Sequence, residues 1–104
     1  MKYIGKWAGS VNTSFFKGSA VVDIFDNGGE YGFNVTTDAL SQIPEFSVTD
    51  IVEGENSLSG TATVNMFGGI KAKVRVVFDG DRFTGTITIP MFGDIPILDG
   101  RRIG

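Results

Sequence analysis

The clearest structural signal in the chain is the stretch Leu58-Ser59-Gly60-Thr61-Ala62-Thr63-Val64-Asn65-Met66-Phe67-Gly68-Gly69. A similar stretch begins 25 residues later at Phe83, and a fainter one begins 51 residues earlier at Trp7. Each has a large apolar residue, a small residue, Gly and then Ser or Thr, followed by an alternating run that ends in Phe before a turn. The spacing leaves room for a fourth, degenerate unit near Tyr31. The repeat therefore predicts four β-hairpins and eight strands.

The alternation of apolar and polar residues assigns the two faces of these strands. Strands of about ten residues on short turns such as Asp26-Asn27-Gly28-Gly29 indicate an all-β, antiparallel up-and-down meander that closes into an eight-stranded barrel. Residues 37–42 alone have helical character and are expected to form one short turn. We expect an inward, mostly buried set and an outward set: Ala62, Val64, Val74, Val76, Ile87 and Ile89 inward, and Thr61, Thr63, Thr86 and Thr88 outward.

Length and composition are typical of a small globular domain. The 104 residues, 41% hydrophobic with nine Phe, suffice for one core, so we expect a single domain over residues 1–104. The net charge of −3 gives no reason to expect nucleic acid, and no apolar run approaches transmembrane length. The first residues contain no apolar signal region, which favours a cytoplasmic location.

The residue types present also argue against catalysis. Without His or Cys the chain has no imidazole base and no thiolate metal site. Acidic turns such as Asp79-Gly80-Asp81 could supply oxygen ligands to calcium, but Asp and Gly are turn residues in any case. On the inner face only Asp50 could serve as a base, and a bulge near it would turn it outward. We expect no enzyme activity, no metal and no cofactor.

Consecutive turns of a meander lie at opposite ends of the barrel, so its two ends should differ in chemistry. One end collects acidic turn residues. The other end collects a set that we name the apolar rim: Phe15, Phe16, Leu40, Ile43, Met66, Phe67, Met91 and Phe92. An apolar patch of that size exceeds the few hundred Å² that soluble monomers usually expose. We therefore expect the rim to be covered by a small apolar ligand, by a second copy of the chain or by residues 36–45.

Gly5-Lys6-Trp7 on the first strand of an eight-stranded meander resembles the G-x-W signature of the lipocalin and calycin superfamily. In that superfamily the Trp closes one end of the barrel and a basic residue of the last strand packs across it. The resemblance implies that Trp7 is a closing residue, that Arg101 or Arg102 covers it, and that a ligand enters at the apolar rim. The run Met91-Phe92-Gly93-Asp94-Ile95-Pro96 looks like the Met-x-Gly-x-x-Pro hairpins of small bacterial barrel domains without an assigned role.

Together these observations predict a calycin-like barrel that binds one small apolar molecule through the apolar rim. The alternative is a protein-interaction or self-association module, such as a homodimer, that buries the same rim. An elongated apolar cavity would favour the first function, and a filled core with a covered rim would favour the second.

Overall fold

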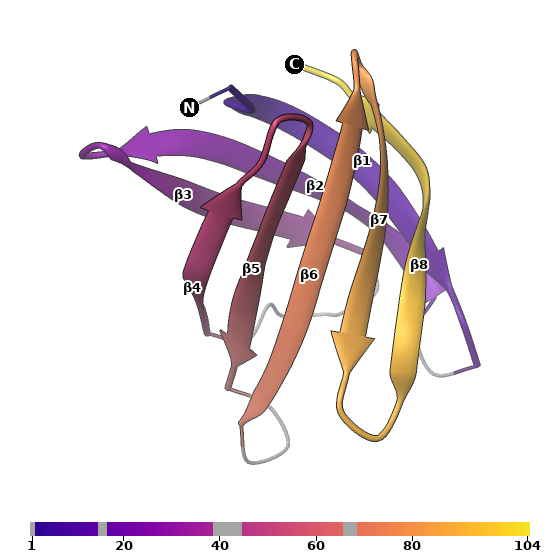
Figure 1. Ribbon diagram of the computed structural model, residues 1–104. Coiled ribbons are helices and arrows are strands. Elements are labelled where there is room, and N and C mark those ends of the chain that lie inside the picture. Colours follow the sequence, from indigo (N-terminus) through magenta and orange to yellow (C-terminus); the bar gives the residue numbers. More distant parts are fainter. Residues whose placement is uncertain (1, 15–16, 39–44, 66–68) are drawn as a thin grey trace.

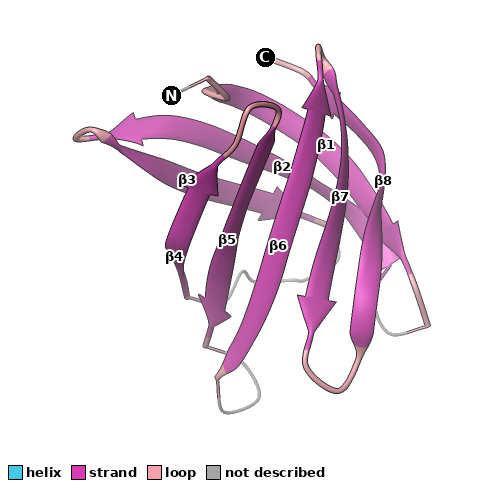
Figure 2. Ribbon diagram, viewed as in Figure 1, coloured by secondary structure: helices cyan, strands magenta, loops and turns pink. Residues whose placement is uncertain are grey.

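The computed structural model describes residues 2–14, 17–38, 45–65 and 69–104. Within these ranges the chain forms strands and no helix, so none of the described residues belongs to a helix that could cross a membrane (Figures 1 and 2). Most of the helical turn expected at 37–42 lies outside the described residues. The strands are β1 (Gly5–Asn12), β2 (Lys17–Asn27), β3 (Glu30–Thr37), β4 (Phe46–Glu53), β5 (Ser57–Val64), β6 (Ile70–Asp79), β7 (Arg82–Ile89) and β8 (Gly93–Arg102).

All eight strands belong to one antiparallel sheet with the order β3-β2-β1-β8-β7-β6-β5-β4. The sheet curls so strongly that β1, β2 and β3 cross behind β4 to β7 (Figure 1). The prediction of an all-β, up-and-down, eight-stranded fold is confirmed. The predicted closure is not seen in the described part of the chain, where β3 and β4 remain the two unpaired edges. The structure is thus a half-barrel, and we name the gap between β3 and β4 the seam.

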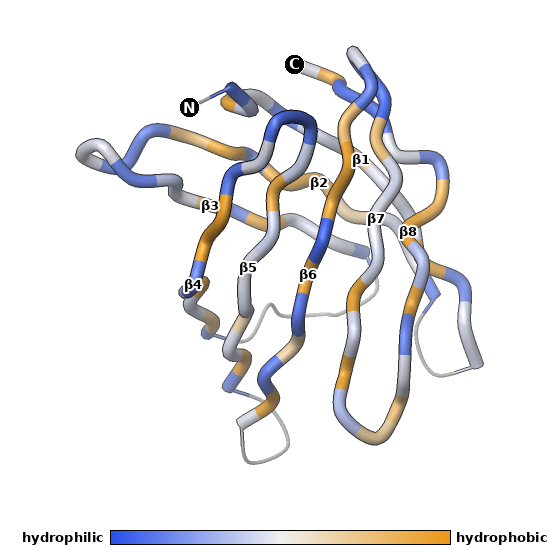
Figure 3. The backbone as a smooth tube through the Cα atoms, viewed as in Figure 1, coloured by the Kyte–Doolittle hydropathy of each residue, from blue (hydrophilic) through white to orange (hydrophobic). Residues whose placement is uncertain are grey.

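The register places apolar and polar side chains on opposite faces, as the alternation predicts. Figure 3 shows this alternation of hydropathy along β6. One row across β5 to β8 consists of Gly60, Val74, Ile87 and Ile95. The neighbouring row on the opposite face consists of Thr61, Lys73, Thr88 and Asp94. The concave inner face is therefore apolar, and the outer face carries hydroxyls and charges.

The best-packed part of the core lies at the end of the sheet near the chain termini. Tyr3 stacks on Phe78 with ring centroids 3.9 Å apart, and Trp7 meets Phe78 edge-on at 4.8 Å. Ile24 and Leu58 complete the buried cluster. Every large side chain that the structure describes keeps at least 2% of its surface exposed, so this core has no fully buried centre. A half-barrel of this size fills one end of its interior with its own side chains and leaves the remainder of the inner face partly accessible.

Strand β8 contains one residue more than either neighbour over the same stretch. While β7 advances from Phe83 to Gly85, β8 spans Gly100 to Ile97, and a matching register shift occurs against β1. Asp99 has a φ of 53° at this point, which identifies a β-bulge. In a regular strand, residues three positions apart lie on opposite faces. The extra residue reverses this alternation, so Gly100 is buried on the same face as Ile97.

A second bulge lies in β4. The register shifts between Thr49 and Val52, and Asp50 has a φ of 56°. Asp50 borders the same outer-face depression as Thr61 and Lys73. The bulge therefore turns Asp50 away from the inner face, as expected from the sequence.

Candidate ligand-binding site

The inner face of β5, β6 and β7 keeps apolar surface that the protein does not cover. Six aliphatic side chains expected to be mostly buried are incompletely covered: Ala62, Val64, Val74, Val76, Ile87 and Ile89. Their face was predicted correctly and most of their surface is buried, as predicted, although none of the six is fully covered. A closed barrel would have packed the strands opposite against them, whereas the curled sheet leaves the seam open. These residues form a continuous apolar wall, because their strands pair in register.

A groove of about 490 Å³ runs along the seam and opens onto the edge of this wall. Its inner-facing residues come from both edge strands, and the rings of Tyr31 and Phe33 are stacked with centroids 6.2 Å apart. Two exposed carboxylates, Glu30 and Glu45, lie on opposite sides of its mouth. The full lining is Asn27, Glu30, Tyr31, Gly32, Phe33, Asn34, Glu45, Phe46, Ser47 and Val48.

Three residues bridge the seam at the end near the termini, and we name them the seam bridge: Lys2, Tyr31 and Glu53. The Tyr31 hydroxyl donates a hydrogen bond to the Glu53 carboxylate, and the backbone N–H of Lys2 donates to the Tyr31 hydroxyl oxygen and to the Glu53 carboxylate, each at 3.1 Å. Burial, followed by the bond to Glu53, raises the pKa of Tyr31 to about 12. The bonds from Tyr31 and from the Lys2 N–H lower the pKa of the Glu53 carboxyl. The bridge therefore ties β3 to β4 where the strands themselves do not pair.

The tryptophan of the first strand lies in the core, and an arginine of the last strand lies over it. Trp7 is 5% exposed and its Nε1–H donates to the Tyr3 carbonyl at 3.0 Å. The Arg102 guanidinium carbon lies 5.4 Å from the centre of the Trp7 ring. Arg102 also donates to the carbonyl oxygens of Ile4 at 3.0 Å and Gly104 at 3.2 Å. Arg102 thus links the residues before β1 to the last residue of the chain while it covers the Trp7 ring.

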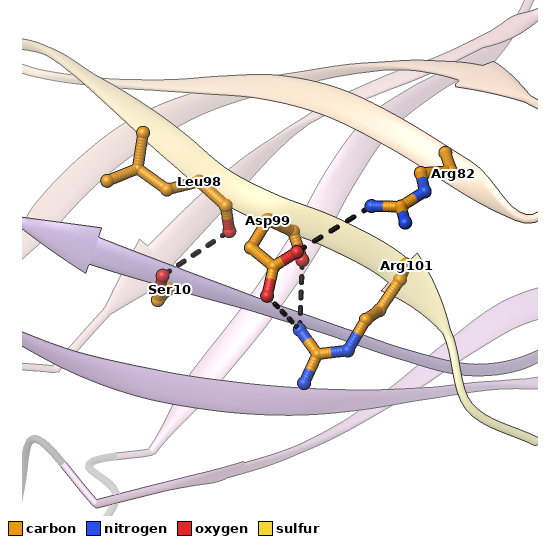
Figure 4. A network of polar contacts seen from close by, with 5 residues as sticks. All are labelled: Ser10, Arg82, Leu98, Asp99 and Arg101. Carbon is orange, nitrogen blue, oxygen red and sulfur yellow. Dashed lines mark hydrogen bonds and ion pairs between the residues drawn. The ribbon is translucent and has the colours of Figure 1, made fainter.

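Arg101, the other candidate for this position, points away from Trp7. Its guanidinium donates to the carboxylate of Asp99 at 2.9 Å and to the Asp99 carbonyl at 3.0 Å. Arg82 lies on the other side of the same carboxylate at 3.7 Å (Figure 4). This network lies at the bulge of β8 on the exposed surface, apart from the inner face. Of the two arginines, the structure places Arg102 on the ring.

The structure describes only part of the apolar rim. Met91 and Phe92 form the β7–β8 turn, where Met91 is fully exposed with a φ of 73° and Phe92 is 46% exposed. The Phe92 N–H donates to the Ile89 carbonyl at 3.1 Å and closes the turn. The other six rim residues lie outside the described residues: Phe15, Phe16, Leu40, Ile43, Met66 and Phe67.

The outer face of β5 to β7 holds a shallow depression of about 430 Å³. Lys73 and Arg75 lie there beside hydroxyl residues of the neighbouring strands, with Asp50 at the margin. In the described ranges no group of three or more acidic residues gathers as a metal ligand set. The depression lies on the outer face and opens to solvent, whereas the inner face carries the row of aliphatic side chains, so we take the inner face with its seam groove as the candidate site.

The seam residues were not singled out by the sequence. Tyr31 and Phe33 are recognisable as inward residues of a strand, but the sequence gives no sign that β3 and β4 remain unpaired. Glu45 and Glu53 belong to the linker and a turn in the sequence. Glu45 lines the groove and Glu53 belongs to the seam bridge, and the approach of both to β3 follows from the path of the curled sheet.

No protein-family model, curated protein or solved structure matches this chain. The likeness to calycins therefore consists of Gly5-Lys6-Trp7 and an eight-stranded half-barrel compatible with a barrel fold.

Proposed function

We propose that this half-barrel is a non-catalytic binding protein that holds one small apolar molecule against its inner face. The observation that carries the proposal is the wall of incompletely covered aliphatic side chains on β5, β6 and β7. Each 100 Å² of such surface removed from water contributes about 2.5 kcal/mol. A ligand that covers a few hundred Å² would gain about 5–8 kcal/mol, against an association cost that starts at about 4 kcal/mol.

The calycin likeness supports the same function. In this proposal Trp7 and Arg102 close the end of the half-barrel near the termini, and the ligand occupies the inner face beyond them. The remaining apolar-rim residues would border the opposite end, as the sequence pattern predicts. The seam gives the ligand a second, lateral route to the inner face.

The proposal is tested with a neutral apolar fluorescent probe, N-phenyl-1-naphthylamine, together with native mass spectrometry of the purified protein for a retained molecule. Ala62→Phe adds a ring to the inner face and should weaken probe binding at least about tenfold by occupying the space. Thr63→Phe adds the same ring to the outer face of the same strand and should leave binding unchanged. Equal binding by both variants, or no binding by the wild type, would reject the inner face as a ligand site.

Self-association through the apolar rim is the second candidate function. The exposure of Met91 and Phe92 at the β7–β8 turn favours it. A dimer held by this rim should dissociate in the double variant Met91→Ser with Phe92→Ser, while circular dichroism stays that of the wild type. Native mass spectra that show a monomer for wild type at micromolar concentration would reject this alternative.

A further inference from the structure

We propose that the seam groove receives the head group of the ligand and that this head group is cationic. The inference rests on the proposed function, because the apolar body of the same molecule would lie on the inner face. The ligand class is then an amphiphile with an amine or quaternary ammonium head, and fatty acids and other anionic amphiphiles are excluded from the site.

The groove and the inner face are continuous. Val48 lines the groove and pairs with Ala62 of the apolar wall. Phe46 lies two residues away on the same strand and pairs with Val64, again a residue of the wall. A molecule whose apolar part contacts β5 can therefore extend its other end past Phe46 and Val48 into the groove, whose surface is mostly polar.

The groove becomes acidic toward solvent. Glu30 of β3 and Glu45 beside β4 contribute one carboxylate from each side, and no Lys or Arg is among the described residues that line it. The neutral polar groups are those of Asn27, Asn34 and Ser47. The ion pairs that the structure describes lie elsewhere, at Asp99. Glu30 and Glu45 consequently have no described cation between them.

The aromatic residues of the groove suit the same head group. The rings of Tyr31 and Phe33 both line the groove, and an ammonium within about 6 Å of an aromatic centre is attracted by the ring quadrupole. Lys2 lies at the seam bridge, and its Nζ is engaged there because it donates to the Glu55 carbonyl at 3.1 Å. An anionic head in the groove would meet two carboxylates and no compensating charge, so charge complementarity selects the cation.

The test compares three probes that share one decyl chain: decyltrimethylammonium, decanol and decanoate. Each is titrated below its micelle concentration, and dissociation constants are measured by displacement of a fluorescent apolar probe. The wild type should bind the ammonium about tenfold more tightly than the alcohol and should bind decanoate least. The double variant Glu30→Gln with Glu45→Gln should bind all three within about twofold. Glu55→Gln, which removes an exposed carboxylate outside the groove, is the matched control and should keep the wild-type order.

The outcomes separate the two proposals. If the wild type binds all three probes equally, or decanoate best, the cationic head group is rejected while the apolar site stands. A preference for ammonium that survives in the double variant also rejects it, because the groove carboxylates are then not its source. If none of the probes binds, the inner face is not a ligand site, and both proposals fail. Circular dichroism of each variant confirms that it is folded.

Discussion

The two adjacent arginines at the end of β8 allow a matched perturbation, in which Arg102→Met and Arg101→Met each remove one guanidinium. Arg102 loses a cation–π contact with Trp7 at 5.4 Å, worth about 0.5–1 kcal/mol at an exposed site. It also loses two hydrogen bonds to carbonyls, at 3.0 and 3.2 Å, each worth about 1 kcal/mol after exchange with water. Arg102→Met should therefore destabilise the protein by about 2–3 kcal/mol.

Arg101→Met removes an exposed ion pair with the Asp99 carboxylate and an exposed hydrogen bond to the Asp99 carbonyl, and it should cost less than about 1 kcal/mol. Urea unfolding followed by the emission of the single Trp measures both variants. With an m-value of about 1–1.5 kcal/mol/M for a domain of this size, Arg102→Met should shift the midpoint by more than about 1 M. If Arg101→Met costs as much as Arg102→Met, the assignment of Arg102 to the Trp7 ring is refuted.

Three further predictions follow from the packing and the seam. Gly100→Ala should cost about 2–3 kcal/mol, because a Cβ there would lie 2.3 Å from a backbone oxygen of β7, and an unchanged denaturation midpoint would contradict that close approach. Val74→Asp should unfold the protein by placing a carboxylate on the inner face, whereas Lys73→Asp on the outer face should change stability by about 0.5 kcal/mol or less. Circular dichroism measures both variants, and a folded Val74→Asp beside an unfolded Lys73→Asp would show that the two faces are assigned the wrong way round. The pKa of Tyr31 is raised to about 12, above its ordinary value of about 10, so the stability contributed by its hydroxyl is present below pH 10 and is lost as the pH rises toward 12. The pKa of Glu53 is lowered, so its contribution is present above the ordinary Glu pKa and is lost on acidification. Unfolding midpoints measured across pH for wild type and Tyr31→Phe should diverge in the neutral range and converge at both extremes. Coincident profiles would show that the Tyr31 hydroxyl contributes nothing, and profiles separated by a constant amount would show that its contribution does not depend on the titration of Tyr31 or Glu53.

Much of the fold could be predicted from the sequence because it is encoded locally. A period of two assigns each strand's faces, and Gly-rich turns limit each strand, so the eight strands and their up-and-down order follow from short windows. The bulge that turns Asp50 outward could also be anticipated, since a carboxylate on an apolar face is costly.

What could not be predicted depends on contacts between distant strands. Strict alternation from Ile95 would point Arg101 inward, and the bulge at Asp99 gives that position to Arg102 instead. Two adjacent arginines give no local sign of this choice. The open seam depends on how far the whole sheet curls. No single stretch of sequence therefore predicts the incomplete burial of the inner wall or the groove at Tyr31.

The pairing of β1 with β8 has a consequence for circular permutation, that is, for the order in which the same strands could follow one another along a chain. It is the only described pairing between strands that are not neighbours in sequence, and the hydrogen bonds between Lys6 and the last two residues bring the chain ends together (Figure 1). A circular permutant that joins these ends and begins at β4 would turn the sheet into an uninterrupted series of hairpins. Its contact order would fall, because the one long-range ladder would become local, and such topologies fold faster at similar stability. The seam would then coincide with the new chain ends, so that the groove lay between the first and last strands of the protein.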